Sequence, residues 1–122
     1  MAVEADSTGA NSREGAVAAL EVVAATAESV AEEQHRIARE ARLLATARRR
    51  GAAWTQLVGG DGVGRLLTRL RRSGTLLMAN ARRLQAATAR SLADEGLTTR
   101  QIGARFGVSH QRISTLMGRR DD

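Results

Sequence analysis

The sequence of 122 residues contains no cysteine, proline, tyrosine or lysine. Without cysteine it can form neither a disulfide framework nor a thiolate metal site. Trp54 and Phe106 are its only aromatic residues, so alanine, leucine, valine and isoleucine supply most of its 43% hydrophobic share. These residues suit thin helical packing. A core of that kind leaves little stability to spare, which makes support from a partner chain reasonable.

The sequence lacks the motifs typical of secreted, membrane, phosphate-binding and metal-binding proteins. The first residues show no secretory signal, and no apolar stretch approaches membrane-spanning length, so we expect a cytoplasmic protein without membrane association. Residues 59–64 are glycine-rich but lack the lysine of a phosphate-binding loop. Glu32 and His35 have the spacing of a di-iron ligand pair, but His110 is the only other histidine. We therefore expect no enzyme, catalytic residues, metal, cofactor or small-molecule site.

The charges are unevenly distributed. Residues 1–35 carry one arginine against seven acidic residues, whereas residues 36–122 carry eighteen arginines against six. An acidic N-terminal segment followed by a basic remainder favours a polyanionic partner for the basic residues 36–122. The alternative is a GC-rich genome that encodes arginine wherever lysine would serve, and the absence of lysine fits that explanation.

A long helix is expected near the N-terminus. Residues 1–11 are small and polar and predict a mobile tail, and residues 12–50 predict a helix that Asn11 or Ser12 caps. Its apolar residues recur every seven positions, at Val23, Val30, Ile37 and Leu44. This spacing indicates a seam that either packs on the chain's own domain or forms a homodimer through the N-terminal helix.

The middle of the chain predicts shorter helices. Gly51 suits the end of the long helix, and a short helix follows at 54–58. A basic helix at 63–72 is expected to break at Ser73-Gly74, and Thr75 to cap a helix that Gly96 ends. The expected core residues of this last helix are Leu76, Leu77, Leu84 and Leu92.

The segment 97–117 predicts two helices joined by a tight turn. Thr98 or Thr99 caps the first helix, Gly107 supplies the turn and Ser109 caps the second. The small Ala104 permits the two helices to cross closely. The residues expected to turn inward are Ile102, Phe106, Val108, Ile113, Leu116 and Met117; those expected to face outward are His110, Gln111, Arg112, Ser114 and Thr115.

These twenty or so residues resemble the helix-turn-helix of bacterial repressors, resolvases and the fourth region of sigma factors. That resemblance implies double-stranded DNA as the partner, with the second helix in the major groove. It implicates His110 and Gln111 in base reading, and Arg100 and Arg112 in backbone contacts. The full set of candidate DNA-contacting residues is Thr99, Arg100, Ser109, His110, Gln111, Arg112, Ser114 and Thr115.

A second, degenerate copy of the pattern lies 45 positions earlier. Gly51, Trp54, Leu57, Gly62 and Val63 occupy the places of Gly96, Thr99, Ile102, Gly107 and Val108. The segment 50–57 also resembles the opening of actinobacterial helix-turn-helix proteins. Leu66 and Leu67 replace the polar readers, so we expect Trp54, Leu57 and Val63 in a core. This copy either packs or contacts phosphates through Arg65, Arg69, Arg71 and Arg72, unless the repeat is coincidental.

The expected fold is all-α: a long N-terminal helix followed by two tandem helix-turn-helix-like units, the first degenerate. The expected segments are 1–11, 12–50, 51–74 and 75–122. The leading functional hypothesis is a sequence-specific transcriptional regulator at the nucleoid. Two alternatives remain, namely a nucleoid-associated architectural protein and a protein-interaction adaptor that works through the long acidic helix.

Overall fold

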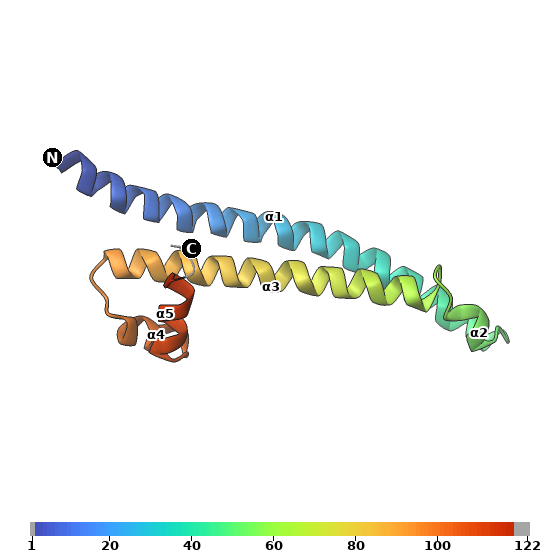
Figure 1. The fold of residues 1–122 in the computed structure, drawn as a ribbon. Coiled ribbons are helices and arrows are strands. Elements are labelled where there is room, and N and C mark those ends of the chain that lie inside the picture. The colour runs from blue at the N-terminus through green and yellow to red at the C-terminus, as the bar shows by residue number, and fades with distance from the viewer. Residues whose placement is uncertain (1, 119–122) are drawn as a thin grey trace. The chain divides into compact units, whose positions relative to one another are not determined.

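The computed structural model describes the backbone of residues 2–118 and the side chains of residues 13–118. This part of the chain is all-α, as the sequence predicted, and contains no strand (Figure 1). Its helices are α1 (Ala2–Arg49), α2 (Trp54–Leu57), α3 (Val63–Asp94), α4 (Thr99–Phe106) and α5 (His110–Gly118). No helix in the described range is long and apolar enough to cross a membrane.

The chain divides into two compact units. The first, here called the hairpin unit, is Ala24–Ala79. It contains the second part of α1, then α2, then the first part of α3, so that two long antiparallel helices lie side by side (Figure 1). The second, here called the terminal unit, is formed from Met1–Val23 and Asn80–Asp122 and contains α4 and α5.

Helix α1 forms as one piece over the range that the sequence predicted. It ends where Gly51 adopts φ of +106°, a conformation that glycine takes without a steric penalty. The backbone is helical from Ala2, so the helix begins well before the boundary expected at residue 11, and neither Asn11 nor Ser12 starts it. Met1, the first residue of the expected tail, lies outside the described residues.

The seven-residue seam of α1 is turned inward. Val30 and Ile37 are buried, and Val23 and Leu44 are half-buried. In the hairpin unit Val30 lies beside Ser73 and Leu76 of α3. The seam there packs against the chain's own α3, which is the first of the two arrangements that its spacing left open.

Helix α3 is continuous, and the break expected at Ser73-Gly74 is wrong. The helix runs through both residues and through Thr75, so the expected boundary between segments 51–74 and 75–122 falls inside it. Glycine inside a helix costs only about 1 kcal/mol relative to alanine, and Ser73 is buried on the side that meets α1. The burial of Ser73 against α1 and the helical residues on both sides outweigh so small a local penalty.

Two expectations about the core fail in the hairpin unit. Leu57 is buried and Val63 half-buried as expected, but Trp54 is 54% exposed, because the four-residue α2 has no further helix to cover it. The Arg48 guanidinium instead lies 5.1 Å from the centre of its ring. Leu76 and Leu77 were also expected in the core and are 47% and 45% exposed.

Candidate functional site

The first helix of the site begins at a capping box. Thr98 precedes α4, and its hydroxyl oxygen accepts a hydrogen bond of 3.2 Å from the Gln101 backbone N–H. The Gln101 side-chain oxygen in turn accepts one of 2.8 Å from the Thr98 backbone N–H. The two bonds satisfy donors that the start of a helix leaves unpaired. Thr98 is therefore the cap, and Thr99 is the first, half-buried residue of α4.

The turn between α4 and α5 depends on two glycines. Gly107 adopts φ of +71°, as expected for the residue that ends α4. Close approach depends on Gly103, which is buried; a Cβ there would lie 2.6 Å from the Val108 carbonyl oxygen and 3.3 Å from the His110 nitrogen. Ala104 was expected to have this role, but it is exposed. A small residue was correctly expected, but the helix turns Gly103 and not Ala104 toward α5.

The second helix is capped and anchored as predicted. The Ser109 hydroxyl oxygen accepts a hydrogen bond of 3.1 Å from the Arg112 backbone N–H, and α5 begins at the next residue. Ile113 is fully buried with Ile102 of α4 and Ala89 of α3. Partly buried side chains surround this cluster, namely Leu92, Ala93, Leu97, Phe106, Val108, Leu116 and Met117. Contacts with α3 and α4 therefore hold α5 in one orientation.

Burying Ile113 leaves a polar face on α5. All five residues that were predicted to face outward are exposed, namely His110, Gln111, Arg112, Ser114 and Thr115. The Thr115 hydroxyl donates a hydrogen bond of 3.0 Å to the Gln111 carbonyl oxygen, so its own oxygen remains able to accept.

The surface around this face is basic. Arg100 and Arg105 are both exposed on α4, and the segment from Leu97 to Gly118 contains three arginines and no acidic residue. Arg105 was not among the candidate residues predicted from the sequence. Its signal was its position two residues before the turn, in the last turn of α4.

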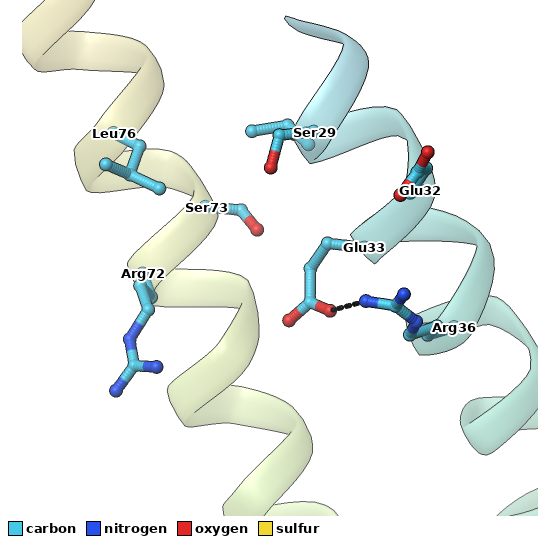
Figure 2. Close-up of a pocket in the computed structure, with 8 residues that line it drawn as sticks. Ser29, Glu32, Glu33, Arg36, Arg72, Ser73 and Leu76 are labelled. Carbon is cyan, nitrogen blue, oxygen red and sulfur yellow. Dashed lines mark ion pairs between the residues drawn. The ribbon is translucent and has the colours of Figure 1, made fainter. Parts of the chain in front are cut away.

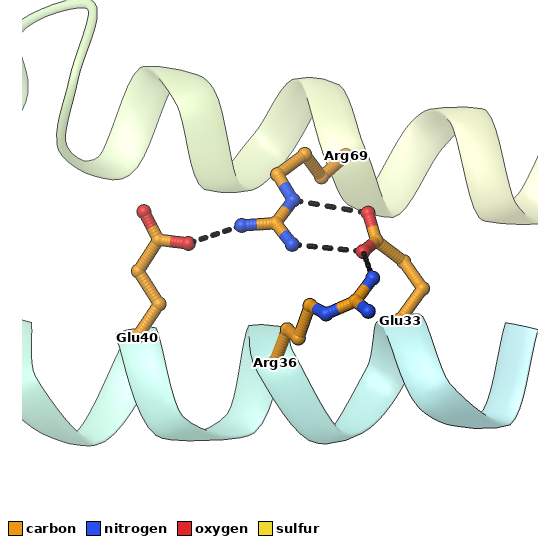
Figure 3. A network of polar contacts seen from close by, with 4 residues as sticks. All are labelled: Glu33, Arg36, Glu40 and Arg69. Carbon is orange, nitrogen blue, oxygen red and sulfur yellow. Dashed lines mark hydrogen bonds and ion pairs between the residues drawn. The ribbon is translucent and has the colours of Figure 1, made fainter.

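The arginines expected to contact phosphates from the first copy differ in availability. Arg65, Arg71 and Arg72 are exposed on α3. Arg69 is turned toward α1, where its Nε and Nη2 atoms donate hydrogen bonds of 3.0 and 2.8 Å to the Glu33 carboxylate (Figure 3). Its Nη1 atom donates to Glu40. The Arg69 guanidinium therefore pairs with carboxylates of the chain itself.

This pairing changes the titration of both partners. The hydrogen bonds from Arg69 lower the pKa of Glu33 below its usual value of 4.5, and the charges of Arg69, Arg36 and Arg72 lower it further. The same hydrogen bonds raise the pKa of Arg69. Arg36 also lies 3.7 Å from the Glu33 carboxylate. The network joins α1 to α3 within the hairpin unit.

A hollow of about 210 Å³ lies beside this network, between α1 and α3 (Figure 2). Its lining residues are Ser29, Val30, Glu32, Glu33, Arg36, Arg72, Ser73 and Leu76. Charges of both signs line it, and no group of three or more potential metal ligands occurs among the described residues. The face of α5, with exposed polar side chains and only basic charges around it, is therefore the stronger of the two candidate binding sites.

Comparison with known proteins supplies no family for either site. No family model, no curated protein and no solved structure matches the chain.

Proposed function

We propose that the protein is a sequence-specific regulator of transcription that binds double-stranded DNA through α4 and α5, with α5 in the major groove. The observation that carries this proposal is the polar face of α5, held outward by the burial of Ile113 against Ile102. The major groove admits a helix and presents a distinct pattern of donors and acceptors for each base pair. A DNA-binding regulator of this kind would act at the nucleoid.

The side chains of α5 match two kinds of DNA contact. In the proposal, His110 and Gln111 lie near the start of α5 and read bases, since the first residues of a recognition helix contact base edges. Glutamine can bind adenine through two hydrogen bonds. Ser109, Ser114 and Thr115 contribute hydroxyl groups that bind a base edge or a phosphate oxygen.

The arginines and Thr99 supply the contacts that do not depend on sequence. Arg100, Arg105 and Arg112 are exposed near the polar face and bind phosphates in the proposed complex. Thr99, at the start of α4, contributes the hydroxyl that the resemblance to helix-turn-helix proteins assigns to DNA. Each phosphate contact releases counterions, so affinity should fall as salt rises.

The test is to select bound sequences from a random duplex pool and to measure two variants on the selected site and on a scrambled site. Gln111→Ala should relax the preference at one base position by about 1–3 kcal/mol. Arg100→Ala should weaken binding to both duplexes alike and flatten the salt dependence by about one unit. Arg39→Ala removes another exposed arginine, on α1, and is the matched control for the loss of charge.

The result also separates this proposal from its rivals. Equal loss of affinity of Gln111→Ala for both duplexes, or no loss for either, would exclude base reading by Gln111. Binding with a steep salt dependence but no preferred sequence would favour an architectural protein, a candidate that the exposed Arg65, Arg71 and Arg72 support. No binding to any duplex would favour an adaptor.

A further inference from the structure

The hairpin unit buries few apolar side chains. Within Ala24–Ala79 the buried apolar residues are Val30, Ile37 and Leu57, and Ser73 is the buried polar residue. A pair of helices has one shared seam, whereas a bundle of four has a central core to which every helix contributes. Small units with little core need additional support, such as association with another chain.

One side of the hairpin carries the hollow and its charged residues, together with the exposed Leu43 and Leu76. Residues of α1 and α3 that line the hollow, including Glu32, Arg36 and Arg72, lie on the same side of the unit (Figure 2). Each residue of a helix turns by about 100°, so the residues on the other side of each helix can be assigned from their numbers. In α3, Arg72 lies on the side of the hollow. The positions on the opposite side of the helix include Leu67, Leu70, Gly74, Leu77 and Met78.

These positions of α3 form an exposed apolar stripe. Leu67 and Leu70 are 42% and 41% exposed, and Leu77 and Met78 are 45% and 57% exposed. They follow one another at steps of three, seven and one, with Gly74 between Leu70 and Leu77. This spacing keeps them on one face of the helix.

The same reasoning places small residues on the corresponding side of α1. The residues there include Ala24, Ala27, Ala31, Ala38 and Ala45, of which Ala38 is half-buried and the others are exposed. The half-buried Gln34 and the exposed Arg42 lie at the two edges of this side. The residues that line the hollow come from the same side of both helices. The residues turned away from the hollow on α1 and on α3 therefore also lie together, on the opposite side of the hairpin. The apolar side of the hairpin therefore pairs leucines and a methionine on α3 with alanines on α1.

We propose that this apolar side binds a second copy of the chain and forms a four-helix bundle. A two-fold axis that runs parallel to the helices places α3 of each copy over α1 of the other. The large side chains of one copy then meet the alanines of its partner, so the surface is complementary to itself, as a symmetric dimer requires. The interface has the form of a helix bundle with alternating large and small residues.

The size of this side suits a dimer. From Val63 to Ala79 it is about 25 Å long, and two helices make it about 20 Å wide, which gives about 500 Å² in projection. This estimate is smaller than the roughly 800 Å² that each partner buries in an interface of standard size, so the dimer is expected to be reversible at micromolar concentration. The proposed surface differs from the seam at Val30 and Ile37, which is already buried within the chain. It does not depend on DNA binding.

Sedimentation equilibrium of the full chain over a range of concentrations tests the proposal. The wild type should form a dimer at micromolar concentration. Leu70→Glu and Met78→Glu should each weaken dimerisation at least tenfold, because each places a charge in the apolar interface. Leu43→Glu is the matched control: Leu43 is 71% exposed on α1, on the side of the hairpin that carries the hollow, and its replacement should leave the dimer intact.

Circular dichroism at each concentration distinguishes dissociation from failure to fold. Met78 is the most exposed residue of the stripe, so its variant should remain helical even if Leu70→Glu does not fold. A wild type that remains monomeric at 100 micromolar or above, or one that forms oligomers larger than two, would overturn the proposal. So would a helical Met78→Glu variant that dimerises as tightly as the wild type, or an equal effect of Leu43→Glu.

Discussion

At the scale of single residues, the site depends on a few positions with strict steric or polar requirements. Ser109 supplies a hydroxyl to the Arg112 backbone N–H, and Ile113 fills a fully buried position. Gly103 leaves room for the turn that joins α4 to α5. Each acts on the orientation of α5, and Ser109 is in addition one of the residues proposed to contact DNA directly.

We expect Gly103→Ala to destabilise the protein. Its new Cβ would lie 2.6 Å from the Val108 carbonyl oxygen, a backbone atom that can move only with the turn itself. The expected cost is about 1–3 kcal/mol in the free energy of unfolding, which urea denaturation would measure.

Gly15→Ala is the matched control, because nothing lies within 4 Å of the added methyl group in α1. That change should be neutral or stabilising by up to about 1 kcal/mol. If Gly103→Ala unfolds at the same urea concentration as Gly15→Ala, the packing between α4 and the turn is looser than the structure indicates.

At the scale of helices, the contact between α1 and α3 in the hairpin unit combines an apolar seam with ion pairs. Arg69 binds Glu33 through two hydrogen bonds, and its side chain is only 19% exposed. An arginine and a carboxylate that share two parallel bonds set the rotation and register of the helices more strictly than apolar contact does. The same helices present the apolar side proposed to bind a second copy.

This contact should make stability depend on acid pH. The folded pKa of Glu33 lies below 4.5, so its stabilising effect is complete above that pH and is lost as pH falls through the folded pKa. Thermal melting between pH 6 and pH 2 should therefore show a smaller acid-induced decrease for Glu33→Gln than for the wild type.

The appropriate comparison is Glu32→Gln, which removes an adjacent and more exposed carboxylate of α1. This variant should keep the acid-induced decrease of the wild type. Parallel curves for Glu33→Gln and the wild type throughout the titration would show that the pairing with Arg69 does not contribute to stability.

At the scale of the whole molecule, the two proposals assign different work to different units. The hairpin unit holds two copies together, and the terminal unit contacts DNA through α5. A two-fold symmetric dimer presents two identical recognition helices, and such proteins bind two half-sites with inverted sequence.

Sequences selected from a random duplex pool by the wild type should therefore contain a motif repeated in inverted orientation. The Met78→Glu variant should select the same motif as a single copy, with lower affinity, because it keeps α5 but loses the dimer. Control selections with Leu43→Glu should recover the inverted repeat. A single motif selected by a wild type that sediments as a dimer would separate dimerisation from DNA recognition.

Much of the candidate site could be predicted from the sequence because its rules are local. The cap at Ser109, the glycine in the turn and the burial of Ile102 and Ile113 follow from the spacing of residues three and four apart. The same spacing predicted which side chains of α5 are exposed. Their contact with DNA remains a proposal.

The rest could not be predicted because it depends on what lies against each helix. Local preferences determined the all-α class and the unbroken course of α1 as far as the Gly51 turn, since alanine-rich sequence without proline favours helix wherever it packs. Tertiary packing decided that α3 continues through Ser73 and that Leu77 is exposed. It also turned Arg69 toward Glu33, because the seam of α1 sets which side of α3 faces inward.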